Sequence, residues 1–149
     1  MSLDYSNKEL IAPTRACGKE TLRAFAPRMG KRYTNGRNYD RGAGLHRDVS
    51  MLSPYLRRRL VLEQDAVATA VLEHGAEGAK KFIQEVIWRG YFKGWMERRP
   101  VVWDQYREGL MRDLMALDRD RGLRRCVEAA EAGQSGLDYF DTWAEELVE

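Results

Sequence analysis

Residues that build metal centres and disulfide frameworks are scarce in this sequence. Its 149 residues include only two cysteines and two histidines. Cys17 and Cys126 lie far apart and His46 and His74 are isolated, so no spacing typical of a metal site or a redox pair occurs. We therefore expect reduced thiols, a cytoplasmic location and no metal site.

Long apolar runs are also missing. No segment approaches the roughly 18 consecutive apolar residues of a membrane-spanning helix, and the polar amino terminus lacks the apolar core of a signal peptide. Charge is nearly balanced, with 25 basic and 23 acidic residues and a formal net charge of +2. This balance does not by itself indicate a nucleic-acid partner, because DNA binding would require locally clustered arginine.

Sustained alternation of apolar and polar residues, the pattern of a β-strand, does not occur. Apolar residues instead recur at intervals of three and four, as in an amphipathic helix. The composition, 44% hydrophobic and 32% charged, is ordinary for a globular chain. We therefore predict an all-α fold, a helical bundle forming a single domain over residues 1–149, with residues 1–12 as an extended arm.

Turn and cap residues predict how the first half of the chain is divided. Pro13-Thr14 opens a helix, and residues 33–49 form a polar loop. Ser53 is the expected N-cap, and Pro54 the first residue, of a helix that runs through Leu60. The helix opened at Pro13 buries one side, which carries Leu22, Ala26 and Met29.

The remainder is expected to be helical almost throughout. Gly75 caps the carboxyl end of one helix, and Pro100 ends another. Residues 133–136, Gly-Gln-Ser-Gly, form a break. The predicted helices span residues 64–72, 76–99, 102–118, 122–132 and 137–148.

The predicted helix over residues 76–99 carries two largely apolar faces, so we expect it to be covered on both sides. Gly90 and Gly94 each cost helix propensity, and close approach of a neighbouring helix to bare backbone would compensate. Glu85 and Arg89 stand in the favourable order for an i,i+4 ion pair. One face contains Ala79, Phe82, Ile83, Val86, Ile87, Gly90, Tyr91, Gly94 and Trp95; the other contains Glu85, Trp88, Arg89, Phe92 and Met96.

Three segments, in this order, resemble the FAD-binding helical domain of the photolyase/cryptochrome family. Residues 33–39 (YTNGRNY) are similar to the family's entry loop, and residues 50–56 (SMLSPYL) to its phosphate motif. Residues 84–92 (QEVIWRGYF) are similar to its tryptophan-bearing helix. A weaker fourth match covers residues 133–147, with Asp141 at the motif's aspartate.

The resemblance implies FAD as cofactor and assigns residues to its phosphates. Tyr33 would contact the phosphate region of the flavin cofactor. Ser50 and Ser53, with amides such as that of Leu52, would bind the diphosphate. This assignment agrees with general physics, because the amino terminus of a helix presents unpaired N–H groups and the positive end of its dipole to an anion. Capping of the helix by Ser53 is the simpler structural role.

The resemblance also implies a pocket for damaged DNA. Phe82 would border the adenine or the substrate pocket, and Arg89 would reach toward the flavin. Glu85 would hydrogen-bond a base extruded from the duplex, and Trp88 would stack on it. The structural alternative for these residues is an ordinary ion pair between Glu85 and Arg89 beside a packed Trp88.

Departures from the family pattern limit the expected activity of this chain alone. Val49 stands where the phosphate motif has threonine, and Gly90 where the helix has glutamate. The Asn-Arg-x-Arg-Met segment of the family does not occur before Glu149. We therefore expect a partial FAD-binding domain without an antenna domain, inactive on its own. The parent activity would be that of a DNA-repair lyase, light-driven electron transfer from reduced FAD to pyrimidine dimers.

Two other interpretations stay open. The chain could be a non-catalytic helical module that forms a homo-oligomer or binds a partner through an exposed face around Trp88, Phe92 and Met96. It could also be an unrelated helical bundle. Short arginine runs are either solvated faces or a diffuse phosphate-contacting surface; they lie at residues 57–59, 98–99 and 124–125.

Overall fold

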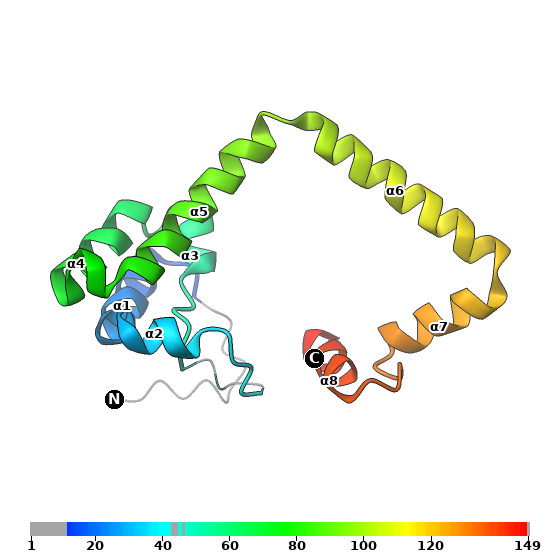
Figure 1. The fold of residues 1–149 in the computed structure, drawn as a ribbon, viewed down its shortest axis with the longest axis horizontal. Coiled ribbons are helices and arrows are strands. Elements are labelled where there is room, and N and C mark those ends of the chain that lie inside the picture. Colours follow the sequence, from blue (N-terminus) through cyan, green and yellow to red (C-terminus); the bar gives the residue numbers. More distant parts are fainter. Residues whose placement is uncertain (1–11, 43–44, 46, 149) are drawn as a thin grey trace. The chain divides into compact units, whose positions relative to one another are not determined.

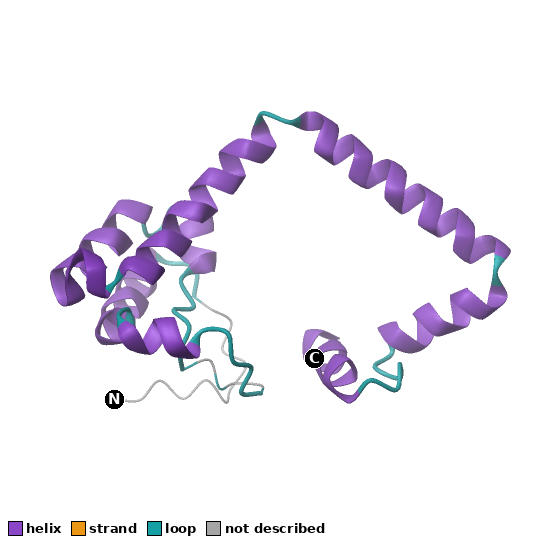
Figure 2. Ribbon diagram, in the orientation of Figure 1, coloured by secondary structure: helices purple, strands orange, loops and turns teal. Residues whose placement is uncertain are grey.

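The computed structural model describes residues 12–42, 45 and 47–148, and their regular structure is entirely helical. The all-α prediction is confirmed. Only Ala12 of the predicted arm lies within the described residues. The helices, drawn in Figures 1 and 2, are α1 (Arg15–Phe25), the 3-10 helix η1 (Ala26–Arg28), α2 (Lys31–Gly36), α3 (Ser53–Arg57), α4 (Glu63–Gly78), α5 (Lys80–Glu97), α6 (Pro100–Arg119), α7 (Arg121–Glu131) and α8 (Asp138–Val148).

The chain divides into two compact units, unit 1 (Met1–Gly94) and unit 2 (Trp95–Glu149). The predicted single domain over residues 1–149 stays a prediction, and the two units are described separately. No helix among the described residues is both long and apolar enough to cross a membrane.

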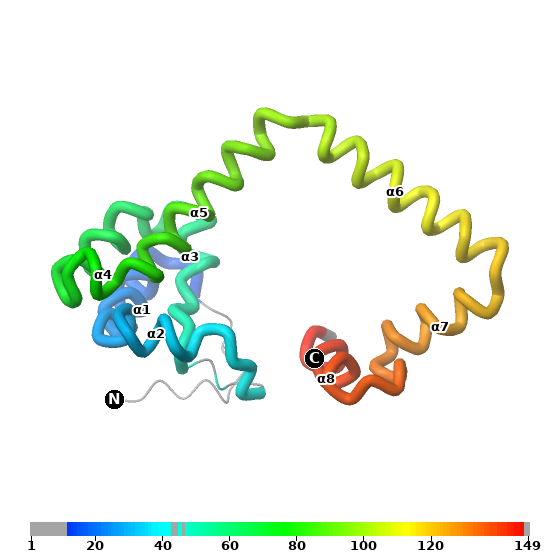
Figure 3. Tube along the Cα trace, viewed as in Figure 1, coloured from blue at the N-terminus to red at the C-terminus, as the bar shows by residue number. Residues whose placement is uncertain are grey.

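Unit 1 is built around one hydrophobic core. Helices α1 to α4 and the first turns of α5 surround it (Figure 3). Burial of this apolar surface is the main stabilising contribution to the unit. The buried hydrophobic residues are Leu22, Phe25, Ala26, Met29, Leu52, Tyr55, Leu56, Val61, Ala66, Ala70, Ala79, Phe82 and Val86.

The first helix forms as predicted. The hydroxyl of Thr14 accepts a hydrogen bond from the backbone N–H of Cys17 at 3.2 Å, which satisfies one of the free N–H groups at the start of α1. The predicted inner side is confirmed, because Leu22, Ala26 and Met29 are all buried.

The predicted loop over residues 33–49 is wrong at its beginning, where α2 continues to Gly36. Tertiary packing stabilises this short helix: the Tyr33 ring lies edge-on to the rings of Phe25 and Phe82, at centroid distances of 6.1 and 5.3 Å. Aromatic pairs favour this geometry. The contact with Phe82 joins residues far apart in sequence, so local turn signals do not reveal it.

The helix at Ser53 begins as expected but is capped differently. Leu52 occupies the N-cap position, Ser53 is the first helical residue, and no side-chain hydrogen bond caps the end. The helix stops at Arg57 and does not reach Leu60, because Arg59 adopts a left-handed conformation with φ of 55°. This reversal directs the next residues back to the core, where Val61 is fully buried.

Gly75 interrupts the chain where a helix end was predicted. Its φ of 71° and ψ of 164° break the helical path within α4, a conformation that favours glycine. Just before Gly75, Nε2 of His74 lies 2.8 Å from the carbonyl oxygen of Ala26. This contact connects this part of α4 to η1. The long helix predicted from residue 76 is divided: residues 76–78 belong to the end of α4, and α5 begins at Lys80.

The predicted coverage of α5 on both faces is wrong within unit 1. Phe82 and Val86 are buried, but Trp88 and Phe92 are 51% and 46% exposed. A Cβ atom built on Gly90 would meet nothing within 4 Å, and the same holds for Gly94. No described helix therefore packs against the backbone at either glycine. Only the first half of the helix is anchored in the core.

Unit 2 consists of α6, α7 and α8, whose ends lie within two residues of the predicted ones. Pro100 begins α6, and the Asp120 carboxylate caps α7 by accepting hydrogen bonds from the N–H groups of Gly122 and Leu123, at 2.8 and 3.0 Å. Helix α7 contacts both α6 and α8. None of the described side chains from Trp95 to Leu147 is buried.

Candidate functional site

The first and third motif segments meet in unit 1. Tyr33 packs against Phe82, and the Arg37 guanidinium lies 3.3 Å from a carboxylate oxygen of Glu85. The Arg37 guanidinium also lies 5.9 Å from the centre of the Tyr33 ring. Packing and an ion pair thus hold α2 against α5. Three of the predicted site residues, Tyr33, Phe82 and Glu85, lie together as a result.

This environment changes the pKa of the Tyr33 hydroxyl. Burial raises the pKa of the Tyr33 phenol, and the nearby negative charge of Glu85 raises it further, whereas Arg37 acts in the opposite direction. Both dominant effects disfavour the tyrosinate. Tyr33 is therefore a neutral hydrogen-bonding group at physiological pH.

Glu85 and Arg89 make their ion pairs with other residues. Glu85 pairs with Lys81 at 3.1 Å as well as with Arg37, and Arg89 reaches back to Glu63 at 2.9 Å. The contact of Arg89 joins α5 to the start of α4. Its guanidinium remains partly exposed, at 29% of the side chain, so it can still offer N–H donors to an anion.

The second motif segment supplies both core and surface residues. Leu52 is 1% exposed and belongs to the same core as Phe82. The hydroxyl of Ser50 accepts a hydrogen bond from the N–H of Leu52 at 3.4 Å. Ser53 is exposed. The ion pairs of Glu85 and Arg89 are made with Arg37, Lys81 and Glu63, outside this segment.

Trp88 lies on the open face of α5. Its ring is 5.5 Å from that of Phe92, which in turn contacts Tyr91 at 5.6 Å. This row of half-exposed rings offers flat apolar surface for stacking. No group of three or more histidine, cysteine or acidic side chains suited to a metal occurs among the residues that the structure describes.

A cluster of arginines in residues 28–48 was not recognised from the sequence. Arg32, Arg41 and Arg47 lie around Asp48 although they are not consecutive. A local excess of positive charge was the available signal: this segment holds six basic residues (Arg28, Lys31, Arg32, Arg37, Arg41, Arg47) and two acidic ones (Asp40, Asp48).

The donor set of the second and third motif segments suits a dinucleotide. Exposed hydroxyl and amide donors at Ser53 and a partly exposed guanidinium at Arg89 are groups that bind phosphate. No protein-family model, curated protein or solved structure matches this chain. The resemblance to the photolyase/cryptochrome family therefore stays a prediction, based on residues 33–39, 50–56 and 84–92.

Proposed function

We propose that this chain forms part of the FAD-binding domain of a photolyase/cryptochrome-like protein. In the parent activity, reduced FAD would, when excited by light, donate an electron to a pyrimidine dimer in DNA. The protein's task in such chemistry is to bind, orient and exclude water. The chain's own residues would form one wall of the cofactor site and one wall of the pocket for the extruded base.

The observation that carries this proposal is the meeting of separate motif segments in one unit. Tyr33 touches Phe82, Arg37 pairs with Glu85, and Leu52 shares their core. The convergence supports a common site assembled from all three segments.

Phosphate binding would fall to Ser53, Ser50 and Arg89. The exposed Ser53 stands at the start of α3, where no side chain caps the first-turn N–H groups. Arg89 keeps donors beyond its contact with Glu63, and charge-assisted hydrogen bonds to phosphate are the strong ones. Tyr33, neutral and half-buried, would donate one further hydrogen bond.

Base recognition would fall to Glu85 and Trp88. The half-exposed indole of Trp88 provides a stacking surface for an unpaired base. The Glu85 carboxylate, with its side chain 37% exposed, keeps acceptor capacity beyond its two ion pairs. The apolar face of α5 that carries Trp88 and Phe92 is not covered by unit 1. This is consistent with a pocket of which unit 1 forms one wall only.

The proposal is tested by titrating the purified chain with FAD, ADP and riboflavin, followed by calorimetry and flavin fluorescence. Because the phosphate donors are on this chain, FAD and ADP should bind weakly, with dissociation constants between about 10 μM and 1 mM. Riboflavin, which lacks phosphate, should bind at least about tenfold more weakly.

Variants distinguish this site from non-specific attraction. Ser53→Ala and Arg89→Gln should each weaken FAD binding several-fold, whereas Arg125→Gln, which removes one exposed arginine of α7, should not. Equal affinity for riboflavin and FAD, or no binding at millimolar FAD, would refute the assignment. Tight, stoichiometric flavin would instead show that the chain is more than one wall of the site.

A homodimer is the second candidate, favoured by the apolar exposure of unit 2. Trp103 and Tyr106 on α6 are 61% and 60% exposed, and Tyr139 and Trp143 on α8 are 61% and 49% exposed. Leu110 and Leu114 are also more than 40% exposed, so α6 and α8 each leave apolar surface uncovered. Apolar surface of this kind is what a second copy of the chain would cover in a dimer.

Sedimentation equilibrium tests this candidate directly. A dimer that dissociates in Trp103→Ser/Tyr106→Ser, with helix content unchanged, would support it. The matched variant Arg107→Gln/Arg112→Gln alters the same helix without removing apolar surface and should leave the dimer intact. A monomer at high micromolar concentration would eliminate the homodimer.

A further inference from the structure

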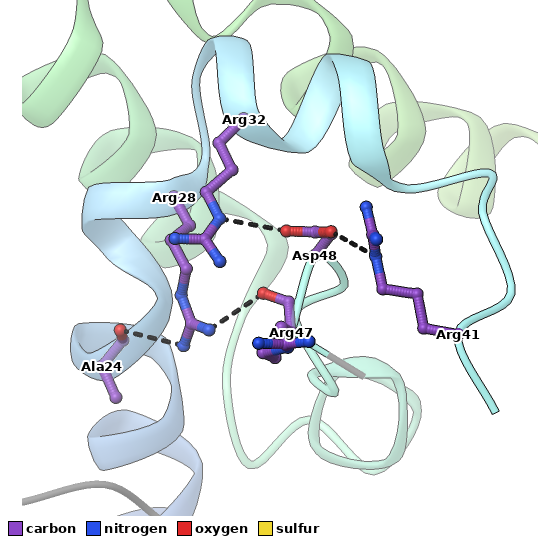
Figure 4. Close-up of polar contacts among 6 residues, drawn as sticks. All are labelled: Ala24, Arg28, Arg32, Arg41, Arg47 and Asp48. Carbon is purple, nitrogen blue, oxygen red and sulfur yellow. Dashed lines mark hydrogen bonds and ion pairs between the residues drawn. The ribbon is translucent and has the colours of Figure 1, made fainter. Parts of the chain in front are cut away.

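Asp48 organises two arginines that come from different parts of unit 1. Its two carboxylate oxygens each accept one hydrogen bond, from Nε of Arg32 on α2 and from Nε of Arg41 in the following loop, both at 3.0 Å (Figure 4). The Asp48 side chain is only 12% exposed, whereas those of Arg32 and Arg41 are 56% and 43% exposed. A sheltered carboxylate thus fixes two outward-facing guanidinium groups.

Gly36 makes room for this arrangement. A Cβ atom at this position would lie 2.6 Å from Cγ of Asp48, closer than any real contact. The carboxyl group of Asp48 therefore rests directly against the backbone at the end of α2. A larger residue at 36 would push Asp48 away and release both arginines.

Most hydrogen-bond donors of the cluster remain available. Arg32 and Arg41 each use Nε on Asp48, which leaves the four N–H groups on the two Nη atoms of each side chain outside this contact. Arg47 binds through its backbone carbonyl oxygen, which accepts from Nη1 of Arg28 at 2.9 Å. The Arg47 guanidinium has no ion-pair partner among the described residues.

These side chains line a concavity. A pocket of about 470 Å³ is bordered by Arg32, Asn35, Gly36, Arg41, Arg47 and Asp48. Three guanidinium groups and one carboxylate give its lining a surplus of two positive charges. Fork-shaped guanidinium donors match the oxygens of phosphate, and a pre-oriented fork loses less entropy when it binds.

We propose that this pocket binds the phosphate groups of a small anion such as a nucleoside diphosphate. Its guanidinium groups would hold the phosphate oxygens, and Asp48 acts as the positioning residue that keeps two of them in place. Two guanidinium groups fixed on one carboxylate suit the closely spaced oxygens of a single diphosphate, whereas the backbone of an extended nucleic acid needs a basic stripe. This inference does not depend on the flavin proposal, which uses Ser53 and Arg89.

The test is calorimetric titration of the full chain with inorganic pyrophosphate and with ADP. Pyrophosphate should bind, and Arg47→Gln should weaken it about tenfold, because the Arg47 side chain contributes charge without supporting the fold. Arg125→Gln, which removes an exposed arginine of α7, serves as the control that should leave pyrophosphate affinity unchanged. Tighter binding of ADP than of pyrophosphate, with both weakened by Arg47→Gln, would identify a nucleotide as the source of the phosphates at this pocket, and similar affinities would identify free diphosphate.

Asp48→Asn separates positioning from bulk charge. The substitution makes the pocket more positive, so a purely electrostatic surface would bind pyrophosphate more tightly. Loss of the carboxylate that orients Arg32 and Arg41 should instead weaken binding several-fold. Tighter binding by Asp48→Asn, an unchanged affinity in Arg47→Gln, or binding of a single-stranded oligonucleotide without binding of pyrophosphate would each overturn the proposal.

Discussion

The two units form helices equally readily but bury their side chains very differently. Among the described residues of unit 1, thirteen hydrophobic residues are buried in one core. In unit 2, none of the described side chains from Trp95 to Leu147 is buried, although α6 alone is 20 residues long. In unit 2, local signals were sufficient to predict where the helices begin and end, but they do not supply a core. Most helix stability in proteins comes from packing of an apolar face, so the units should respond differently to the same kind of substitution.

The largest contrast is expected from removing one aromatic ring in each unit. Phe82 is 3% exposed and contacts Phe25 and Tyr33, so Phe82→Ala should cost about 3–5 kcal/mol of unfolding free energy. Trp103 is 61% exposed, and Trp103→Ala should change stability by no more than about 0.5 kcal/mol. Urea denaturation followed by circular dichroism measures both. A large loss in Trp103→Ala would mean that a partner covers unit 2.

Alanine at two glycines should have opposite effects. A Cβ atom at Gly18 would come within 2.8 Å of Val61 and 2.9 Å of Tyr55, both buried, so Gly18→Ala should destabilise unit 1 by about 1–3 kcal/mol. Gly90 faces open space, and Gly90→Ala should stabilise α5 by up to about 1 kcal/mol. Thermal melts of the two variants provide the comparison. Destabilisation by Gly90→Ala would reveal a neighbouring element against this face.

Removing a helix cap should lower the stability of the whole of unit 1 but only that of the capped helix in unit 2. Thr14→Ala and Asp120→Ala each remove a side-chain cap that contributes about 1 kcal/mol. Helix α1 packs on the core, so the loss at Thr14 should lower the stability of the whole of unit 1. The loss at Asp120 should appear as faster amide hydrogen exchange in α7 alone. Uniformly faster exchange across unit 2 in Asp120→Ala would indicate cooperative folding there.

Tyr33 should make the stability of unit 1 depend on pH in the alkaline range. Because burial and Glu85 raise the pKa of Tyr33 above its ordinary value of 10.0, folding favours the neutral phenol. Its contribution to stability is complete below about pH 10 and is lost as pH rises through the folded-state pKa. Tyr33→Phe should therefore flatten the fall in stability above pH 10. An unchanged profile would place the phenol in solvent.

Asp141 should show the smallest effect, at the acidic end. Hydrogen bonds from the hydroxyl and N–H of Ser135, and from the N–H of Gly136, lower the pKa of Asp141 below its ordinary value of 3.8. The stabilisation is present above about pH 4 and is lost as pH falls through the folded-state pKa. Ser135→Ala should move the carboxyl titration, followed by carbon NMR, back toward 3.8. An identical titration curve would mean that this loop does not hold the carboxylate.

Sequence signals predicted local structure well and tertiary contacts poorly. Caps and breakers at Thr14, Gly75 and Pro100 located real helix boundaries. The helical path through Tyr33 was missed, because its support comes from rings on α1 and α5. Periodicity gave both faces of α5, but it could not tell which one would be covered.

The candidate sites follow the same rule. Motif resemblance selected Tyr33, Phe82 and Glu85, which do lie together, but their contacts join segments about fifty residues apart and cannot be read from spacing. The pocket around Asp48 was not predicted from the sequence, because its arginines are not consecutive. Only the return of the chain after α2 brings Arg41 and Asp48 beside Arg32.

The position of the last core residue has a consequence for biosynthesis. Every buried hydrophobic residue of the described chain lies at or before Val86. Chains emerge from the ribosome amino terminus first, and compact units fold as they emerge. The described core residues of unit 1 are therefore all synthesised before α6 to α8, so this core can begin to form while unit 2 is still being made.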